Sequence, residues 1–341
     1  MVHYIGLDGH SGTCTFVAVD QVGKITSKTR VPTAEGFLLR YVRGLKGPKK
    51  LVLEESHISQ WLYLTLKKEV DELIVCNPTY LGRKQGVKDD FRDSLHLANE
   101  LRCGHLIPVH HEASELWSLR SLVQAYLDVT CQLIQTKNRY KALFNAQAIA
   151  VTGTAVYKDK TLIDQLMTNE DRFVARALFQ QVEQMSATKA SYLPEFDRYS
   201  AKHQQIKRLC TVPGISIVRA TIITSLVCSP DRFQNKHKFW AYSMLVKYVD
   251  TSDDVVYGKR TVQGRRELKA VFDGAAVSVL KGDSALRKYY DRLRTNKVAH
   301  KSAKKAVARR IAAICLALLK GQGKYDDLHE VKRERLKIKS V

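Results

Sequence analysis

Short hydrophobic runs alternate with stretches of helical periodicity along the first 110 residues. The run at 3–9 is apolar until it closes on a charged side chain, Asp8, and a glycine-containing turn then leads to a β-branched run at 16–19. The predicted strands are 3–9, 16–19, 49–55, 71–78 and 105–110, and the predicted helices are 59–70 and 89–101. This alternation predicts an α/β domain with a mixed sheet.

The periodicity becomes helical after residue 112. Residues 114–149 contain no glycine or proline and keep apolar side chains at helical spacing, which predicts one long helix. After a glycine-containing break, residues 159–208 read as helical again. We therefore expect a helical hairpin or coiled-coil arm at 113–208. Its apolar stripe exceeds what a small α/β domain can cover, so we also expect it to mediate self-association.

The predicted architecture is thus α/β plus all-α. Two strands joined by a tight turn and followed by strand–helix units favour a sheet of the ribonuclease H type over residues 1–112. A helical C-terminal domain is expected at 209–326, with a charged tail at 327–341. A Pro-Gly-Ile sequence around Gly214 has the form of a helix-hairpin-helix, in which backbone N–H groups bind phosphate. An ordinary turn between two core helices explains the same pattern.

The charge of the chain is strongly unbalanced. Its 341 residues include 56 Lys and Arg against 34 Asp and Glu, a formal net charge of +22. This excess favours a polyanionic partner, because each neutralised phosphate releases counterions. The 7 cysteines form no CxxC pair, which argues against a zinc or disulfide framework and fits a reducing cytoplasm. We expect a cytoplasmic protein without a signal peptide or a membrane-spanning segment.

Four carboxylates lie where an α/β domain exposes strand ends and first helical turns. Asp8 closes the first strand, Glu54 ends a later one with Glu55 directly behind it, and Asp90 and Asp93 share one helix face. Clustered acids repel one another unless they bind cations, and Mg²⁺ prefers such oxygen ligands. Two such ions activate a nucleophile and stabilise the leaving oxygen in phosphodiester chemistry. Taken singly, each acid is more typical of a turn or a solvated helix start, but two acids that end apolar strands in a very basic chain together favour the metal site.

Seven short motifs occur along the chain in a fixed order. They are YIGLDGH, LVLEES, VCNP, KDDFRD, LHLANEL, QTKNRYKALF and VPGISIVRATI. Over nearly the whole chain they resemble the DEDD insertion-sequence transposases of the "IS one-ten" family, which are bridge-RNA-guided recombinases. The resemblance implies a first domain like the junction nuclease RuvC, with Asp8, Glu54, Asp90 and Asp93 as a catalytic Mg²⁺ site and Mn²⁺ as an alternative ion. Because the family has alanine after the glutamate, Glu55 is a second candidate for that ligand.

The resemblance also implies a serine nucleophile in the C-terminal domain. The family pattern is an aromatic helix, a proline-containing loop, Ser-Gly, and a basic glycine-containing turn into a helix, and residues 240–276 match it in outline. Ser252 takes the reactive position, where a hydroxyl can hold a broken strand covalently and later return it. The chain departs from the pattern at Asp253, normally glycine, and at Lys247, normally proline. From the residues alone, Thr251 and Ser252 are more typical of a turn or an N-cap than of a nucleophile, and it is the resemblance that favours Ser252.

Basic side chains and one glycine turn are the candidate nucleic-acid contacts. They are Lys137, Arg139, Gly214, Lys259, Arg260, Arg265, Arg266, Lys301, Lys304 and Lys305. Phosphate contacts provide affinity without sequence information. The resemblance implies donor and target DNA, a structured bridge RNA, a prokaryotic cell with association to the nucleoid, and no membrane. It also implies a homo-oligomer, dimer or tetramer, whose acids and serine come from different protomers.

Other functions compete with a recombinase at this point. A metal-dependent nuclease of the junction-resolvase type would use the four acids with Ser252 as a bystander, and a covalent protein–DNA adduct separates the two. An inactive relative retained for nucleic-acid binding is favoured by the altered serine loop but disfavoured by the intact acids. An actin-like sugar kinase shares the IGLDG start but requires further glycine-rich phosphate loops, which the sequence lacks.

Overall fold

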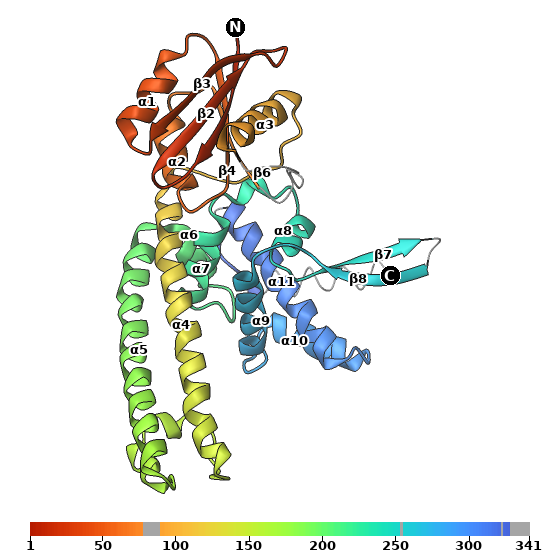
Figure 1. Ribbon diagram of the computed structural model, residues 1–341. Coiled ribbons are helices and arrows are strands. Elements are labelled where there is room, and N and C mark those ends of the chain that lie inside the picture. The colour runs from red at the N-terminus through yellow and green to blue at the C-terminus, as the bar shows by residue number, and fades with distance from the viewer. Residues whose placement is uncertain (78–88, 253–254, 322, 328–341) are drawn as a thin grey trace. The chain divides into compact units, whose positions relative to one another are not determined.

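The structure is a computed structural model that describes residues 1–77, 89–252, 255–321 and 323–327 (Figure 1). The chain divides into two compact units, Met1–Ser114 and Glu115–Val341. The finer boundaries predicted at residues 208 and 326 stay predictions. No helix in the described part of the chain is both long and apolar enough to cross a membrane.

The first unit is built on a six-stranded sheet with the order β3-β2-β1-β4-β5-β6 (Figure 1). The strands are β1 (His3–Gly9), β2 (Thr13–Val19), β3 (Ile25–Pro32), β4 (Lys49–Glu54), β5 (Glu72–Cys76) and β6 (Pro108–Val109). β1 is antiparallel to β2 and parallel to β4, and β5 is parallel to β4. This confirms the predicted mixed sheet and is consistent with a ribonuclease-H-like domain. The sequence analysis missed β3.

Side chains of β1 alternate between the two faces of the sheet. The helices of this unit are α1 (Glu35–Gly44), α2 (Ser59–Leu66) and α3 (Asp90–Cys103). Ile5 and Leu7 are buried in the core with apolar residues of α1 and α2, whereas Gly6 faces α3. A Cβ atom on Gly6 would lie 1.9 Å from the carbonyl oxygen of Ser94. Glycine at this position therefore allows α3 to pack directly on the strand.

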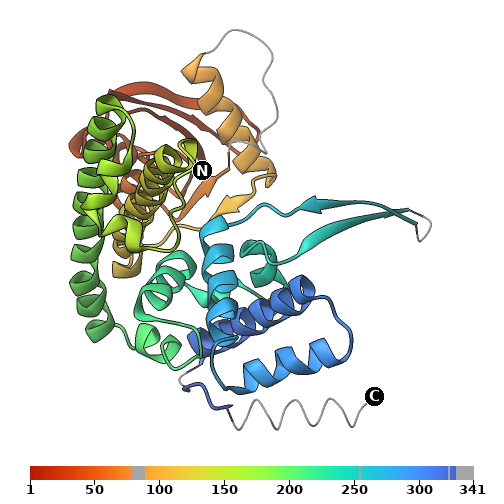
Figure 2. The same cartoon turned by 90° about the horizontal axis from the view of Figure 1, so that it is seen from below.

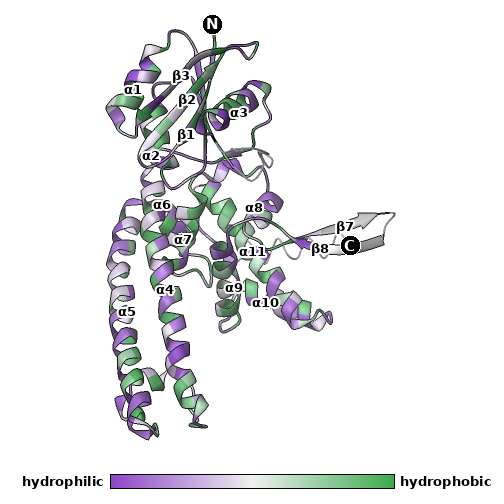
Figure 3. Cartoon of the chain, in the orientation of Figure 1, coloured by the Kyte–Doolittle hydropathy of each residue, from purple (hydrophilic) through white to green (hydrophobic). Residues whose placement is uncertain are grey.

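A helical hairpin opens the second unit. Helix α4 (Glu115–Ala146) lies beside α5 (Asn169–Lys202), and the short helices η2 (Ala155–Tyr157) and η3 (Lys160–Gln165) join them (Figure 1). Hydrophobic and hydrophilic positions alternate along both long helices (Figure 3). The predicted hairpin is confirmed, and a coiled coil stays a prediction.

The apolar stripe of α4 is covered within the same chain. At one end Tyr140 and Phe144 pack with Phe179 of α5, and at the other end Leu119 and Val123 belong to the core of the C-terminal helices. The argument that this stripe requires a second copy of the chain was therefore wrong. Self-association itself stays a prediction.

The rest of the second unit is a helical cluster with one β-hairpin. Its helices are α6 (Gln204–Leu209), α7 (Ile217–Val227), η4 (Pro230–Arg232), α8 (Lys236–Tyr242), α9 (Arg266–Val279), α10 (Ala285–Thr295) and α11 (His300–Lys320). Helix α11 packs against α6, α8, α9 and α10, and α10 runs beside it in both views (Figures 1 and 2). Strands β7 (Lys247–Ser252) and β8 (Val255–Thr261) pair antiparallel. The expectation of an all-α C-terminal domain was wrong in this segment, where β-branched residues favour strands.

Candidate functional site

Three side chains that can hold a metal ion converge at the end of β1. One ligand atom from each of Asp8, His10 and Asp90 lies within 4.8 Å of the other two. The Asp8 Oδ2 atom is 3.3 Å from Nε2 of His10. Asp8 lies two residues after Gly6 on the same strand face, and Asp90 is the first residue of α3. The close packing of α3 at Gly6 is thus what brings the two carboxylates together.

The electrostatic surroundings of Asp8 fit a bound cation. Partial burial raises the pKa of its carboxyl group, the nearby His10 lowers it, and Asp90 and Asp93 raise it again by repulsion. A divalent cation relieves both the desolvation and the repulsion of such carboxylates. The carboxylate oxygens suit Mg²⁺. The imidazole nitrogen of His10 is a further metal-ligand atom, and it suits Mn²⁺ and other transition-metal ions.

An arginine from the edge of the sheet neutralises one side of this cluster. Arg30 Nη2 donates to Asp90 Oδ2 at 2.8 Å, and its Nε donates to Thr15 Oγ1 at 3.2 Å. Its guanidinium also lies 5.3 Å from the centre of the Phe91 ring. Sequence reasoning missed both His10 and Arg30. His10 belongs to the GLDGH motif and could have been found there. Arg30 lies on β3, a strand that was not predicted.

Glu54 lies at the neighbouring position on the next strand. The register of β1 and β4 pairs Leu7 with Leu53, so that Asp8 and Glu54 follow side by side at the ends of parallel strands. Glu54 is half-buried and Glu55 is exposed. The structure therefore favours Glu54 over Glu55 as the candidate ligand. Its oxygens do not belong to the group of atoms within 4.8 Å of one another.

The remaining acids are placed by the start of α3. Asp93 follows Asp90 by almost one helical turn, and its charge reaches Asp8 closely enough to raise the pKa of that carboxyl group. Asp89, by contrast, is the N-cap of the helix, and its carboxylate accepts a hydrogen bond from the backbone N–H of Phe91 at 3.1 Å. The capping bond explains Asp89 without a metal, whereas no capping bond explains Asp90.

The candidate nucleophile Ser252 is the last residue of β7. Thr251 precedes it in the same strand, and the register pairs the two with Val256 and Val255 of β8. The two residues thus lie in a strand and not at a helix N-cap, and the role of Ser252 as nucleophile stays a prediction. The departure from the family pattern at Asp253, and Asp254 after it, lies outside the described residues.

The two flanks of the serine segment are joined by close backbone packing. A Cβ atom on Gly264 would lie 2.4 Å from the carbonyl oxygen of Tyr242 in α8, and the Arg265 N–H donates to the same oxygen at 2.7 Å. The glycine of the basic turn is thus explained by its contact with the aromatic helix. Arg260 and Arg266 are exposed, while the Lys259 side chain lies outside the described set.

The glycine of the predicted phosphate turn has a structural role of its own. Gly214 has a φ of +83°, and a Cβ atom there would lie 2.5 Å from the carbonyl oxygen of Ala275 in α9. Its own carbonyl accepts a hydrogen bond from Arg219 Nη1 at 2.6 Å. These contacts explain the glycine without a ligand, and phosphate binding at this turn stays a prediction.

The basic candidates on the helices differ in exposure. On α4, Arg139 is exposed, whereas Lys137 is half-buried with its Nζ 4.8 Å from the centre of the Tyr157 ring. On α11, Lys301 and Lys305 are exposed and Lys304 is half-buried. Residues three and four positions apart share a helix face, so the three lysines of α11 form one basic face.

Comparison with known proteins connects both units to one family. A ribonuclease-H-like sheet with carboxylates gathered at the end of β1 first defines the class of the N-terminal unit. Residues 5–147 match a transposase family model of the DEDD IS110 type, and residues 206–291 match a model described as "Transposase IS116/IS110/IS902 family". The chain therefore belongs to the IS110 family of transposases. No curated protein matches the chain.

Proposed function

We propose that this transposase cuts and rejoins DNA strands of an insertion sequence, with Mg²⁺ held by Asp8, Glu54, Asp90 and Asp93. Membership of the family already makes the chain an enzyme of transposition that acts on DNA. The observation that supports the metal site is the convergence of Asp8 and Asp90, half-buried and on different elements, to within 4.8 Å.

Each residue of the cluster has a distinct task in this proposal. Asp8, Asp90 and Asp93 supply oxygen ligands, and His10 and Arg30 hold the carboxylates of Asp8 and Asp90 in position through the contacts described above. Glu54 completes the ligand set from the adjacent strand. When bound, the cation supplies Lewis acidity at a phosphodiester oxygen.

For strand joining, we propose Ser252 as the nucleophile. Its Oγ forms a bond to phosphorus while the bond to the leaving deoxyribose oxygen breaks, so that the energy of the phosphodiester is kept in the adduct. The support is its position between the aromatic helix and the basic turn, which are held together at Gly264. A site composed of acids from one protomer and serine from another accounts for their distance in sequence.

A structured bridge RNA is proposed as the guide for donor and target DNA. The formal net charge of +22 supports a nucleic-acid partner, and the family resemblance points to RNA. The test is sequencing of RNA that co-purifies with the protein after nuclease treatment, followed by recombination of matched donor and target DNA. Purification without a discrete RNA, from cells that carry the whole element, would contradict RNA guidance.

The metal site is tested by a matched pair of substitutions at the start of α3. Asp90→Asn removes a proposed ligand charge, and we expect it to abolish DNA cleavage in Mg²⁺ while the protein stays folded. Asp89→Asn is the control, because asparagine caps a helix as well as aspartate does and the Asp89 carboxylate is explained by its bond from the Phe91 N–H. Full cleavage by Asp90→Asn, or equal loss in both variants, would contradict the metal site.

The serine is tested by trapping the covalent intermediate. Ser252→Ala is expected to lose both recombination and the protein–DNA adduct, whereas Thr251→Ala keeps measurable activity. Asp253→Gly, which restores the family residue, is expected to preserve or raise activity. Mass spectrometry locates the phosphoryl bond directly. An adduct on Thr251 or Tyr257 would refute Ser252, and metal-dependent cutting without any adduct would favour the simple nuclease.

A further inference from the structure

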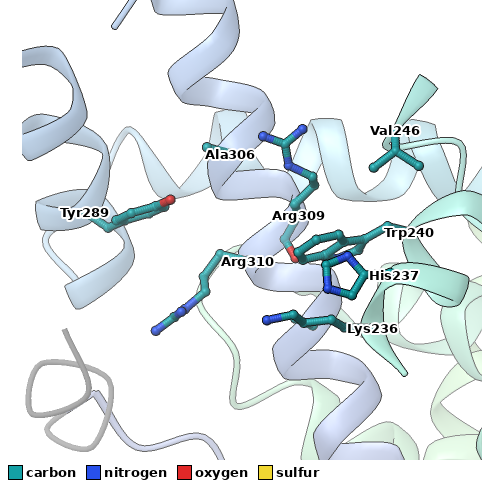
Figure 4. Close-up of a pocket in the computed structure, with 9 residues that line it drawn as sticks. Lys236, His237, Trp240, Val246, Tyr289, Ala306, Arg309 and Arg310 are labelled. Carbon is teal, nitrogen blue, oxygen red and sulfur yellow. The ribbon is translucent and has the colours of Figure 1, made fainter. Parts of the chain in front are cut away.

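A pocket of about 370 Å³ opens in the second unit between α8, α10 and α11 (Figure 4). Its polar and aromatic lining is Lys236, His237, Trp240, Tyr289, Arg309 and Arg310, and the rest of the lining is small and aliphatic. No carboxylate from the described part of the chain lines it. The volume is in the range of small-ligand sites, which starts at about 300 Å³.

One cation of this pocket, Arg309, has no acidic neighbour in the described part of the chain. The guanidinium of Arg309 is half-buried on α11 and forms no ion pair or hydrogen bond with any residue that the structure describes. The Lys236 Nζ lies 5.6 Å from the centre of the Trp240 ring rather than beside a carboxylate. Lys236 is exposed, so the half-buried guanidinium of Arg309 is the group that favours an anionic ligand.

The aromatic side chains form two walls from different helices. Trp240 is fixed by a hydrogen bond from its Nε1–H to the carbonyl oxygen of Arg309 at 2.8 Å, and the His237 ring packs edge-on against it at 4.8 Å. Tyr289 of α10 and Trp240 lie on opposite sides of Arg309, while the Arg310 side chain points away from that of Arg309 (Figure 4). A flat apolar ligand can therefore stack on an aromatic ring while its anionic part meets Arg309.

We propose that this pocket binds a single unpaired nucleotide of the nucleic-acid substrate. Its base stacks on Tyr289 or Trp240, and its phosphate accepts hydrogen bonds from Arg309. A base inside a duplex cannot reach such a pocket, so the ligand is a bulged, looped or flipped nucleotide. The exposed lysines of α11 then contact the adjoining backbone. This inference rests on the proposed function only in taking nucleic acid as the partner.

Binding of the full-length protein to two duplexes of equal length tests the pocket. One duplex is fully paired and the other carries a single bulged 2-aminopurine, and each is made as DNA and as RNA to identify the source of the nucleotide. We expect about tenfold tighter binding of a bulged duplex, with 2-aminopurine fluorescence quenched by stacking. Tyr289→Ala is expected to remove this preference and Tyr289→Phe to retain it.

Substitutions on α11 separate the pocket from general phosphate attraction. Arg309→Gln is expected to remove most of the preference for the bulge. Lys305→Gln, on the exposed face of the same helix, is expected to weaken binding of both duplexes by the same factor. Equal affinity of the wild-type protein for both duplexes, or a preference that survives Tyr289→Ala and Arg309→Gln, would overturn the inference.

The outcome is independent of the proposed chemistry because binding is measured in EDTA, without cleavage. Asp8→Asn is expected to leave the preference for the bulged duplex unchanged, since Asp8 belongs to the first unit. A failed cleavage prediction would therefore leave this result intact, and a failed bulge preference would leave the metal site intact.

Discussion

Gly6 is the residue on which the candidate site depends most directly. Because a Cβ atom there would lie 1.9 Å from the carbonyl oxygen of Ser94, even alanine would push α3 away from β1. We expect Gly6→Ala to lower the free energy of unfolding by about 1–3 kcal/mol, as overpacked cores do, and to abolish cleavage. Gly12→Ala is the control, since nothing lies within 4 Å of its Cβ position. Denaturant unfolding measures both, and equal stability of the two variants would contradict the packing argument.

The choice between Glu54 and Glu55 is also decided at the scale of single residues. A metal that binds only the folded state raises the thermal midpoint of unfolding. We expect Mn²⁺ to raise the thermal midpoint of the wild-type protein and of Glu55→Gln, a substitution at an exposed residue, by the same amount. The midpoint of Glu54→Gln should rise much less. Differential scanning fluorimetry with and without the metal gives the comparison. If Glu55→Gln alone lost the metal-induced shift, the ligand would be Glu55.

At the scale of the elements, local pattern predicted most of the first unit. The buried strands β1, β4 and β5 and helix α3 follow from apolar runs and helical spacing, and so do the positions of the acids on them. β3 was missed because it is a sheet-edge strand whose exposed, polar positions carry only a weak apolar signal. Arg30 lies on that strand, so its contact with Asp90 was beyond the reach of the sequence.

The second unit shows the same limit in another form. A long helix without glycine or proline was read correctly as α4, but its burial depends on α5 and α7, which no local pattern reveals. The hairpin β7–β8 was not predicted, because the segments on both sides of it have helical patterns. Its Val-Val-Tyr run nevertheless favours a strand. Contacts such as that of Gly264 with Tyr242 join residues 22 positions apart, and only the folded chain shows them.

The tip of the α4–α5 hairpin has a small core of its own, which can be tested. Phe179 is 3% exposed and packs against Tyr140 and Phe144, and burial raises the pKa of the Tyr140 hydroxyl to about 12. We expect Phe179→Ala to lower the free energy of unfolding by about 3–5 kcal/mol. Phe173→Ala on the same helix is the control, because that ring is 71% exposed. Limited proteolysis should show new cleavage near the tip only in the first variant.

At the scale of the whole molecule, the covered stripe of α4 changes what self-association would require. A second copy would have to contact other surfaces, and the hairpin offers exposed apolar side chains at Ile134, Phe173 and Leu193. Isolated exposed apolar residues are normal on a monomer, so these do not define an interface by themselves. A dimer or tetramer stays an expectation, which light scattering with and without RNA can test.

The surplus charge of the molecule makes a quantitative prediction about nucleic-acid binding. If about six phosphates are neutralised, log affinity for B-DNA should fall with log salt at a slope of roughly −5, because each contact releases counterions. Removing Lys301 and Lys305 together, both exposed and on one face of α11, should make the slope shallower by about 2. Lys50→Gln is the control. The Lys50 ammonium group is paired with Glu72 at 2.8 Å, so this substitution removes one positive charge that is not available for a phosphate contact. Equal changes of slope per charge removed at Lys50 and on α11 would show that the charge acts as a diffuse surplus. A change confined to the α11 variant would locate the binding face on the helix that also supplies Arg309 and Arg310.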